Sequence, residues 1–246
     1  PGVDWLLVWY PISVALTVLV ITGVANAINI IDGFNGLAAM CTMIMLAGIA
    51  FVANEVGDGF VVAAALVMIG GTFGFFILNY PAGLIFLGDG GAYFLGFMLS
   101  ALGIILVEGN RSVSPLFPLL LCAYPILETL FSMYRRKVVR GLPSAAPDGI
   151  HLHTLIYRRV MRHALGDHHS VERRKTMRNS MTSPYLWMLC LTTTIPAMLW
   201  WDNSMVLAGW IVGFVVLYVA LYWSIVKFRT PRWLVVRGES ESLRSG

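Results

Sequence analysis

The sequence is organised around one stretch, residues 5–36, which reads WLLVWYPISVALTVLVITGVANAINIIDGFNG. It begins with a long apolar run, residues 5–28, that is sufficient to cross a membrane as a helix. Its end carries two amides and a carboxylate, Asn26, Asn29 and Asp32, spaced three residues apart. On a helix this spacing places the three side chains on roughly one face. The stretch therefore predicts a membrane helix that delivers a polar stripe to the membrane surface.

The composition of the 246 residues places the chain among integral membrane proteins. The chain is 58% hydrophobic and only 12% charged, whereas soluble domains carry about 25% charged residues. The first apolar run has no basic segment before it, so we do not expect it to be a signal peptide. The three cysteines lie inside apolar runs and are expected to be core residues, neither disulfide-bonded nor metal-binding.

Seven apolar runs predict seven membrane spans in an all-α, polytopic helical bundle. They are residues 5–28, 37–53, 60–78, 93–107, 116–133, 186–201 and 205–226. The fourth and sixth runs are short for a span, so we expect them to borrow flanking residues. The chain is thus expected to be a single membrane domain, residues 1–246, with a basic loop at residues 134–183 between the fifth and sixth spans.

The basic residues predict the orientation of the bundle. Of the 17 Lys and Arg, 11 lie in residues 134–183 and 5 follow residue 226, while Arg111 alone falls on the other side. The positive-inside rule then makes the basic loop cytoplasmic, together with the loops at residues 30–35 and 79–92. Every unusual polar block of the chain is therefore expected on one side of the membrane.

The second polar block, residues 86–91, reads FLGDGG. We expect Asp89 in a glycine-rich turn, where a carboxylate beside backbone N–H groups suits a magnesium ion that also binds a diphosphate. Asp-Gly is equally a common turn pair, so an ordinary turn is the alternative. Phe86 could stack on a nucleobase or mark the end of a helix at the membrane interface.

The third polar block, residues 148–154, reads DGIHLHT and lies in the basic loop. His151 and His153 are two residues apart and point to the same side only in an extended segment. We therefore expect an extended or turn conformation there, with a helix that starts later, near Leu155. A pair of solvated histidines and a two-histidine metal site are the alternatives.

Glu128 and the basic clusters allow two interpretations each. A carboxylate inside a predicted span is a functional candidate, although Glu128 could equally be a buried partner for an arginine. The clusters at residues 135–137, 158–159 and 173–175 are expected mainly to contact anionic headgroups. One or two of these arginines could instead hold the phosphate of a lipid or nucleotide.

Taken together, the three blocks resemble the polyprenyl-phosphate N-acetylhexosamine-1-phosphate transferases, known in the older naming as glycosyltransferase family 4. The peptidoglycan translocase and the enzymes that initiate O-antigen and common-antigen synthesis belong to this family. Residues 26–33, NAINIIDG, resemble its Asn-Ala-x-Asn-x-x-Asp-Gly block. Residues 86–91 resemble its Phe-x-Gly-Asp-x-Gly block, and residues 151–154 its cytoplasmic histidine block. The blocks stand in the order of the family.

The resemblance implies a magnesium-dependent enzyme, with Mn²⁺ as the alternative ion. Such an enzyme transfers N-acetylhexosamine-1-phosphate from a UDP-sugar to undecaprenyl phosphate, releases UMP, and initiates O-antigen or another cell-envelope polysaccharide. It also implies a multi-pass protein of the bacterial inner membrane with a cytoplasmic active site and no nucleic-acid partner, and it leaves a homodimer open. The implied catalytic residues are Asp32 and Asp89, the latter also the metal ligand, and the implied substrate-binding residues are Asn26, Asn29, Phe86, His151 and His153.

The chain departs from the family pattern at several positions. Thr154 stands where the family often has a further histidine, and Asn35 and Glu128 stand where it often has Asp. The acidic pair of the family lies upstream of the Asn26 block, and nothing upstream here fits it. We therefore expect an N-terminally truncated member of the O-antigen branch, inactive by itself, with an apolar groove along its first spans.

Three other readings remain. A transporter or flippase would place polar residues at mid-span, often in two matching halves. A CDP-alcohol phosphotransferase would carry a dense run of spaced aspartates, which is missing here. A catalytically inactive fragment or regulatory homologue is the third alternative.

Overall fold

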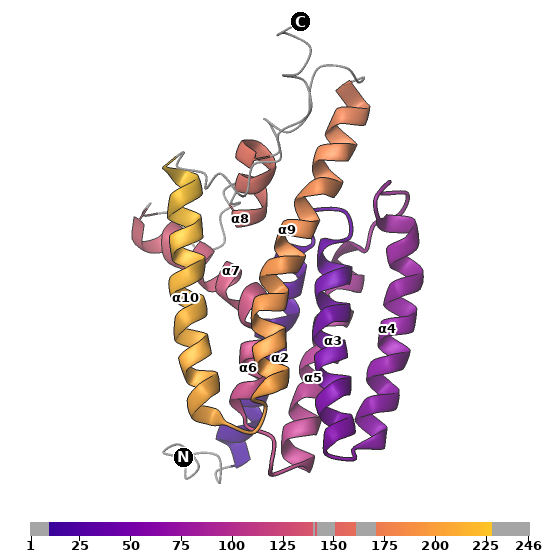
Figure 1. Ribbon diagram of the computed structural model, residues 1–246, viewed down its shortest axis with the longest axis vertical. Helices are drawn as coiled ribbons and strands as arrows, with labels where there is room; N and C mark the ends of the chain where they lie inside the picture. The colour runs from indigo at the N-terminus through magenta and orange to yellow at the C-terminus, as the bar shows by residue number, and fades with distance from the viewer. Residues whose placement is uncertain (1–9, 140, 142–150, 161–170, 228–246) are drawn as a thin grey trace, which may run out of the picture.

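The chain folds into a bundle of long helices, which a computed structural model describes over residues 10–139, 141, 151–160 and 171–227. These residues contain helices and connecting turns but no strand, which confirms the all-α prediction for the described part of the chain. The longest helices run along the long axis of the molecule (Figure 1). In chain order the helices are α2 (Tyr10–Ile31), α3 (Leu37–Glu55), α4 (Gly59–Asn79), α5 (Gly88–Gly109), α6 (Leu116–Leu121), α7 (Ala123–Tyr134), the π-helix η1 (Arg135–Val139), α8 (Leu152–Leu155), the π-helix η2 (Ile156–Val160), α9 (Val171–Leu199) and α10 (Ser204–Val226).

Five of these helices are long and apolar enough to cross a membrane, namely α2, α3, α4, α5 and α10. The other two predicted spans are helical but take different forms. Residues 116–133 divide into α6 and α7, and residues 186–201 fall largely in the second half of the 29-residue helix α9. The predicted count of seven spans is therefore not confirmed, although a multi-pass membrane protein is.

The break between α6 and α7 falls at Cys122, and Pro125 explains it. Proline has no N–H, and its ring clashes with the carbonyl of the residue four positions earlier, which here is Leu121. The Cys122 N–H still donates to the carbonyl of Pro118 at 3.1 Å, and the Cys122 carbonyl accepts from the Ile126 N–H at 3.1 Å. The backbone polar groups beside the break thus keep partners within the apolar interior.

Helices α2 and α5 approach one another closely because α5 has a glycine where they touch. A Cβ atom on Gly96 would lie only 2.5 Å from the Cα atom of Ala25. Small residues allow such backbone contact between helices in membranes. Ala25 precedes Asn29 by one helical turn, and Gly96 follows Asp89 by about two turns. This contact therefore holds the two polar residues at a short separation.

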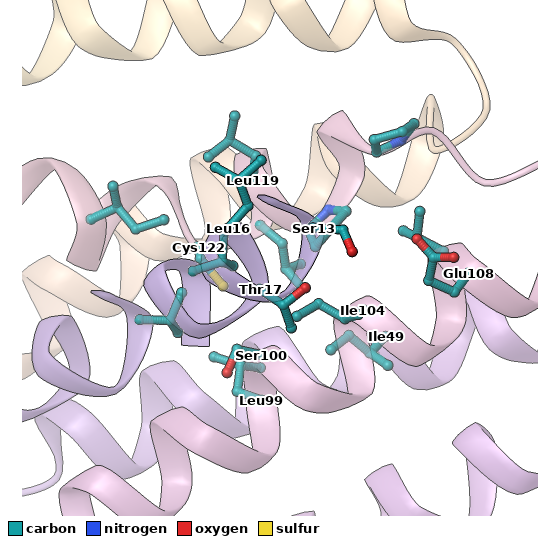
Figure 2. Close-up of a pocket in the computed structure, with 17 residues that line it drawn as sticks. Ser13, Leu16, Thr17, Ile49, Leu99, Ser100, Ile104, Glu108, Leu119 and Cys122 are labelled. Atoms are coloured by element: carbon teal, nitrogen blue, oxygen red, sulfur yellow. The ribbon is translucent and has the colours of Figure 1, made fainter. Parts of the chain in front are cut away.

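The core of the bundle surrounds α3, whose spanning segment is 67% buried, against 17% for α4 and for α10. A cavity of about 610 Å³ lies between α2, α5 and α6 (Figure 2). Its wall is mostly apolar, with the hydroxyls of Ser13, Thr17 and Ser100 and the carboxylate of Glu108 as polar groups. An apolar hollow along the first predicted span is thus present, and none of the predicted site residues lines it.

The chain's polar connections gather at one end of the bundle. The last residues of α2, α4 and α10 and the first residues of α3 and α5 lie toward the top of Figure 1. Helices α2, α3, α4 and α5 alternate in direction, so residues 32–36 and 80–87 meet at this end. The α8 segment with the histidines lies toward the same end. This arrangement agrees with the topology predicted from the charges.

Candidate active site

The end of α2 and the start of α5 bring the first two polar blocks together. The side-chain amide of Asn29 donates from Nδ2 to Oδ1 of Asp89 at 3.0 Å, across 60 residues of sequence. Both residues lie near helix ends, where the α2–α5 contact at Gly96 holds them side by side. The structure thus places Asn29 beside Asp89, as the three-residue spacing of the polar stripe predicted. Asn26 is exposed on α2, one turn earlier.

Asp32 lies in the turn that follows α2 and is partly buried. The pKa of the Asp32 carboxyl is raised from 3.8 to about 7, mainly by burial and in addition by the negative charge of nearby Asp89. Burial acts because water no longer stabilises the ionised form, and a second carboxylate acts by like-charge repulsion. Asp32 and Asp89 are thus electrostatic neighbours at one corner of the bundle.

Asp89 lies in the first turn of α5, not in the turn that the sequence predicted. The helix begins at Gly88, five residues before the predicted span, and Gly88 has a φ of +67°. The first N–H groups of a helix have no partner within it, and the helix dipole favours negative charge there. Asp89 therefore suits the helix start as well as an ion site. Phe86 precedes the helix and is 80% exposed, so its ring is open to a ligand.

A network of amides and hydroxyls fixes the turn that follows Asp32. Asn79 at the end of α4 accepts the Gly36 N–H at 2.6 Å and donates to the Ile85 carbonyl at 2.8 Å. From α9, Ser183 donates to the Asn35 carbonyl at 2.6 Å, and Asn179 accepts the Asn35 N–H at 2.8 Å. Asn79, Asn179 and Ser183 were not among the predicted site residues. For Asn79 the available signal was an amide at the end of an otherwise apolar helix.

Asn35 itself is part of this network. Its side-chain Nδ2 donates to the Pro81 carbonyl at 3.1 Å, and the residue is buried. An aspartate at this position would have no hydrogen to donate. The departure from the family pattern at Asn35 therefore has a structural reason, and the residue acts here as a tie between two loops.

The histidine block packs onto the Asp32 turn. The rings of His151 and His153 stack, with centroids 5.0 Å apart and planes inclined by 12°. His153 is buried, and its ring meets Phe34 edge-on at 5.4 Å. A Cβ atom on Gly33 would lie 3.3 Å from Nε2 of His153. All three polar blocks of the sequence thus converge at one end of the bundle.

The expected conformation of this block was only half right. His151 is extended, with φ −69° and ψ 158°, but α8 begins directly after it at Leu152, three residues earlier than expected. His153 therefore lies in a helix, and the two rings share a side because His151 precedes the first turn. The reason is tertiary: the buried carboxylate of Glu128 accepts the Leu152 N–H at 2.9 Å and stabilises the helix start there.

The match with a known family covers the first two blocks. Residues 3–107 match the family model described as Glycosyl transferase family 4. The match covers less than half of the chain, so it shows that this region is similar to that family. The Asn26–Asp32 stripe and Asp89 lie inside the matched part, whereas Glu128 and the two histidines lie outside it.

Several known proteins are similar to part of the chain. The chain is 40% identical over 139 residues to a probable undecaprenyl-phosphate N-acetylglucosaminyl 1-phosphate transferase of Bacillus subtilis, covering 56% of this chain and 38% of that protein. It is 30% identical over 138 residues to an undecaprenyl-phosphate alpha-N-acetylglucosaminyl 1-phosphate transferase of Thermotoga maritima, covering 56% and 41%. It is 37% identical over 86 residues to a phospho-N-acetylmuramoyl-pentapeptide-transferase of Streptococcus pneumoniae, covering 35% and 26%. The matched region thus spans less than half the length of these relatives.

The donor groups of the candidate site at Asp32 and Asp89 are oxygen atoms. Among the described residues, no three His, Cys, Asp or Glu side chains gather as a metal site. Asp32 and Asp89 form a pair of carboxylates next to the Asn29 amide. A magnesium ion takes one or two protein carboxylates and completes its shell with phosphate and water, so this pair fits such an ion. Burial and, to a smaller extent, repulsion by Asp89 raise the pKa of Asp32, and a bound cation would relieve the repulsion.

Proposed function

We propose that the protein transfers N-acetylhexosamine-1-phosphate from a UDP-sugar to undecaprenyl phosphate and releases UMP. The observation that carries this proposal is the convergence of Asn29, Asp89, Asp32 and the two histidines at one end of a membrane bundle. The names of the relatives support the lipid acceptor and the sugar phosphate. The basic loop supports a site at the cytoplasmic face of the bacterial inner membrane.

The reaction is a phosphoryl transfer. An oxygen of the lipid phosphate attacks the β-phosphorus of the UDP-sugar, and a new phosphorus–oxygen bond forms there. The bond from the β-phosphorus to the oxygen that bridges to the α-phosphorus breaks, and UMP leaves with that oxygen. Catalysis of this kind rests mainly on positioning and on neutralising phosphate charge.

Each part of the site has a task in this proposal. Asp89 and Asp32 would hold Mg²⁺, or Mn²⁺ in its place, which when bound offsets the negative charge of the diphosphate. Asn29 orients Asp89 through their hydrogen bond. Without a bound cation the pKa of Asp32 is about 7, so binding of Mg²⁺ near neutral pH would release a proton from this carboxyl. The exposed Phe86 ring would stack on the uracil, and the histidines would meet the sugar phosphate.

The position of these groups favours a transferase over a transporter. The candidate site lies at one end of the bundle, whereas transporters place substrate sites near the middle of the membrane. A substrate with a soluble nucleotide and a lipid acceptor needs a site at the membrane surface, where both can meet.

The test is calorimetric binding of UDP-N-acetylglucosamine and UDP-N-acetylgalactosamine to the purified chain in detergent, with and without Mg²⁺. We expect Mg²⁺-dependent binding of at least one sugar nucleotide, lost in Asp89→Asn. Glu108→Gln is the matched control, because it removes a carboxylate from the opposite end of the same helix. Sugar-nucleotide binding that does not depend on Mg²⁺, or that is retained in Asp89→Asn, would refute the assignment of Asp89 as a metal ligand. Release of UMP with undecaprenyl phosphate then measures turnover.

A further inference from the structure

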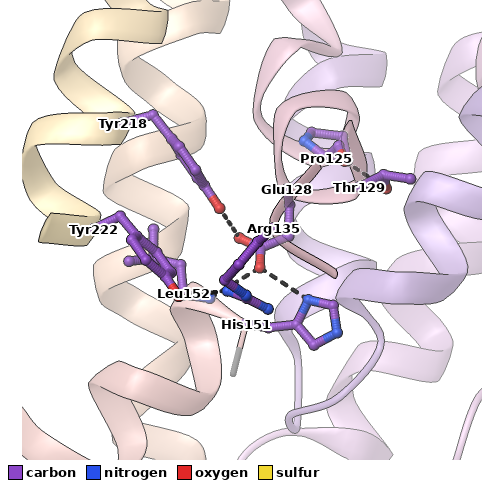
Figure 3. A network of polar contacts seen from close by, with 8 residues as sticks. All are labelled: Pro125, Glu128, Thr129, Arg135, His151, Leu152, Tyr218 and Tyr222. Carbon is purple, nitrogen blue, oxygen red and sulfur yellow. Dashed lines mark hydrogen bonds and ion pairs between the residues drawn. The ribbon is translucent and has the colours of Figure 1, made fainter. Parts of the chain in front are cut away.

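The carboxylate of Glu128 is the most elaborately bonded acidic group of the described residues. It lies on α7 and is only 1% exposed. Its Oε1 accepts the Leu152 N–H at 2.9 Å and lies 3.2 Å from Nδ1 of His151 (Figure 3). Its Oε2 accepts the hydroxyl hydrogen of Tyr218 at 2.7 Å. Burying a carboxylate costs free energy unless hydrogen-bond donors surround it. The fold supplies these donors to Glu128 from two other segments, the start of α8 and helix α10.

The contact with Glu128 determines which nitrogen of His151 carries hydrogen. An ionised carboxylate only accepts hydrogen bonds, so Nδ1 of His151 must be the protonated nitrogen of the contact. Nε2 on the far side of the ring is then left for another partner. The ring is also held from the side by its stack on His153. A carboxylate behind a functional histidine commonly fixes both its tautomer and its orientation.

The last helix of the bundle takes part in the same arrangement. Tyr218 is fully buried on α10 and reaches across to Glu128 on α7. One turn later, Tyr222 accepts a hydrogen bond from Arg135, which follows α7. Phe131 packs edge-on against both tyrosines. Helix α10 thus supports the histidine block from outside the part of the chain that matches family 4.

We propose that Glu128 is the positioning residue of the histidine block. It holds His151 as the Nδ1–H tautomer and leaves Nε2 for the phosphate groups of the sugar nucleotide, while Tyr218 holds Glu128 in place. The role of Nε2 rests on the proposed function, but the tautomer does not. The alternative is that Glu128 has a structural role only and stabilises the start of α8. In that case the tautomer of His151 would not depend on Glu128.

The test is NMR of the chain with ¹⁵N-labelled histidine in detergent micelles, above neutral pH and without ligand, with His151 assigned through His151→Asn. Nitrogen shifts distinguish the protonated from the unprotonated ring nitrogen. We expect Nδ1–H for His151 in the parent chain and a change to Nε2–H in Glu128→Leu. Glu128→Gln keeps a neutral acceptor and should give an intermediate population. Thr129→Val is the control, because its neighbouring buried hydroxyl bonds only to the Pro125 carbonyl of its own helix in the described contacts.

Two results would overturn the proposal: Nε2–H in the parent chain, or a tautomer that is the same in folded Glu128→Leu as in the parent. If Glu128→Leu does not fold, the comparison of Glu128→Gln with the parent decides, and identical spectra refute it. The second readout is binding of UDP-N-acetylglucosamine with Mg²⁺, which should weaken about 10–100-fold in Glu128→Leu, less in Glu128→Gln, and not in Thr129→Val. Unchanged binding in folded Glu128→Leu would contradict the task assigned to Nε2. A parent chain that binds no sugar nucleotide would count against the proposed function, while the ligand-free spectra would still decide the role of Glu128.

Discussion

The substitution Gly96→Ala should separate Asn29 from Asp89 although it touches neither residue. The new Cβ atom would lie 2.5 Å from the Cα of Ala25 and 3.1 Å from its nitrogen. Both are backbone atoms, so no side chain can rotate to make room. Carbon atoms pack at ~3.5 Å or more, and α2 and α5 must therefore move apart by about 1 Å.

This displacement has two measurable consequences. Overpacking at a tight contact destabilises a protein by about 1–3 kcal/mol. A shift of about 1 Å would also lengthen the 3.0 Å bond between Asn29 and Asp89 beyond hydrogen-bonding distance. Misplacement of that size at a site that works by positioning can lower activity about 100-fold.

The matched control is Gly74→Ala on α4, because a Cβ atom on Gly74 would meet nothing within 4 Å. Alanine should be neutral or slightly stabilising there, since it forms helices better than glycine. The measurements are the unfolding midpoint in detergent and the dissociation constant of Mg²⁺-dependent sugar-nucleotide binding. The reasoning is refuted if Gly96→Ala matches Gly74→Ala in both.

Three further predictions concern the site. Asp89→Asn should abolish Mg²⁺-dependent binding while the chain still folds, because the amide keeps the shape of the side chain but not its charge; calorimetry and the unfolding midpoint check this, and normal binding would contradict it. The raised pKa of Asp32, about 7, means that the folded chain retains a proton which the unfolded chain has lost; without divalent cations, the contribution of Asp32 to stability should therefore fall as pH rises from its ordinary pKa toward 7, while Mg²⁺ affinity rises. The pH dependence of stability and that of Mg²⁺ affinity should both be lost in Asp32→Asn. If either remains, another titrating group causes it. Ser183→Ala should lower the free energy of unfolding by about 1–3 kcal/mol, since the buried carbonyl of Asn35 loses its donor; an unchanged midpoint in thermal unfolding would show that this carbonyl has another partner.

The sequence alone was sufficient for the class of protein, for most of the long helices and for the gathering of the polar blocks at one end of the bundle. Apolar runs and basic loops are local properties of the sequence. An apolar run inside a membrane must form a helix, because its backbone polar groups can be satisfied only along the helix, and basic loops indicate its orientation. The polar stripe was also predictable, because the three-residue spacing of Asn26, Asn29 and Asp32 acts through one helix.

Only the tertiary structure decided the contacts between segments that lie far apart in the chain. The pairing of Asn29 with Asp89 depends on a glycine 67 residues further along than Asn29, at a helix contact that no local pattern predicts. The start of α8 was misplaced because the acceptor that stabilises it, Glu128, lies 24 residues earlier on another helix. The role of Glu128 itself was open for the same reason. The energy of a buried carboxylate depends on which donors the fold brings to it, and those donors come here from α8 and α10.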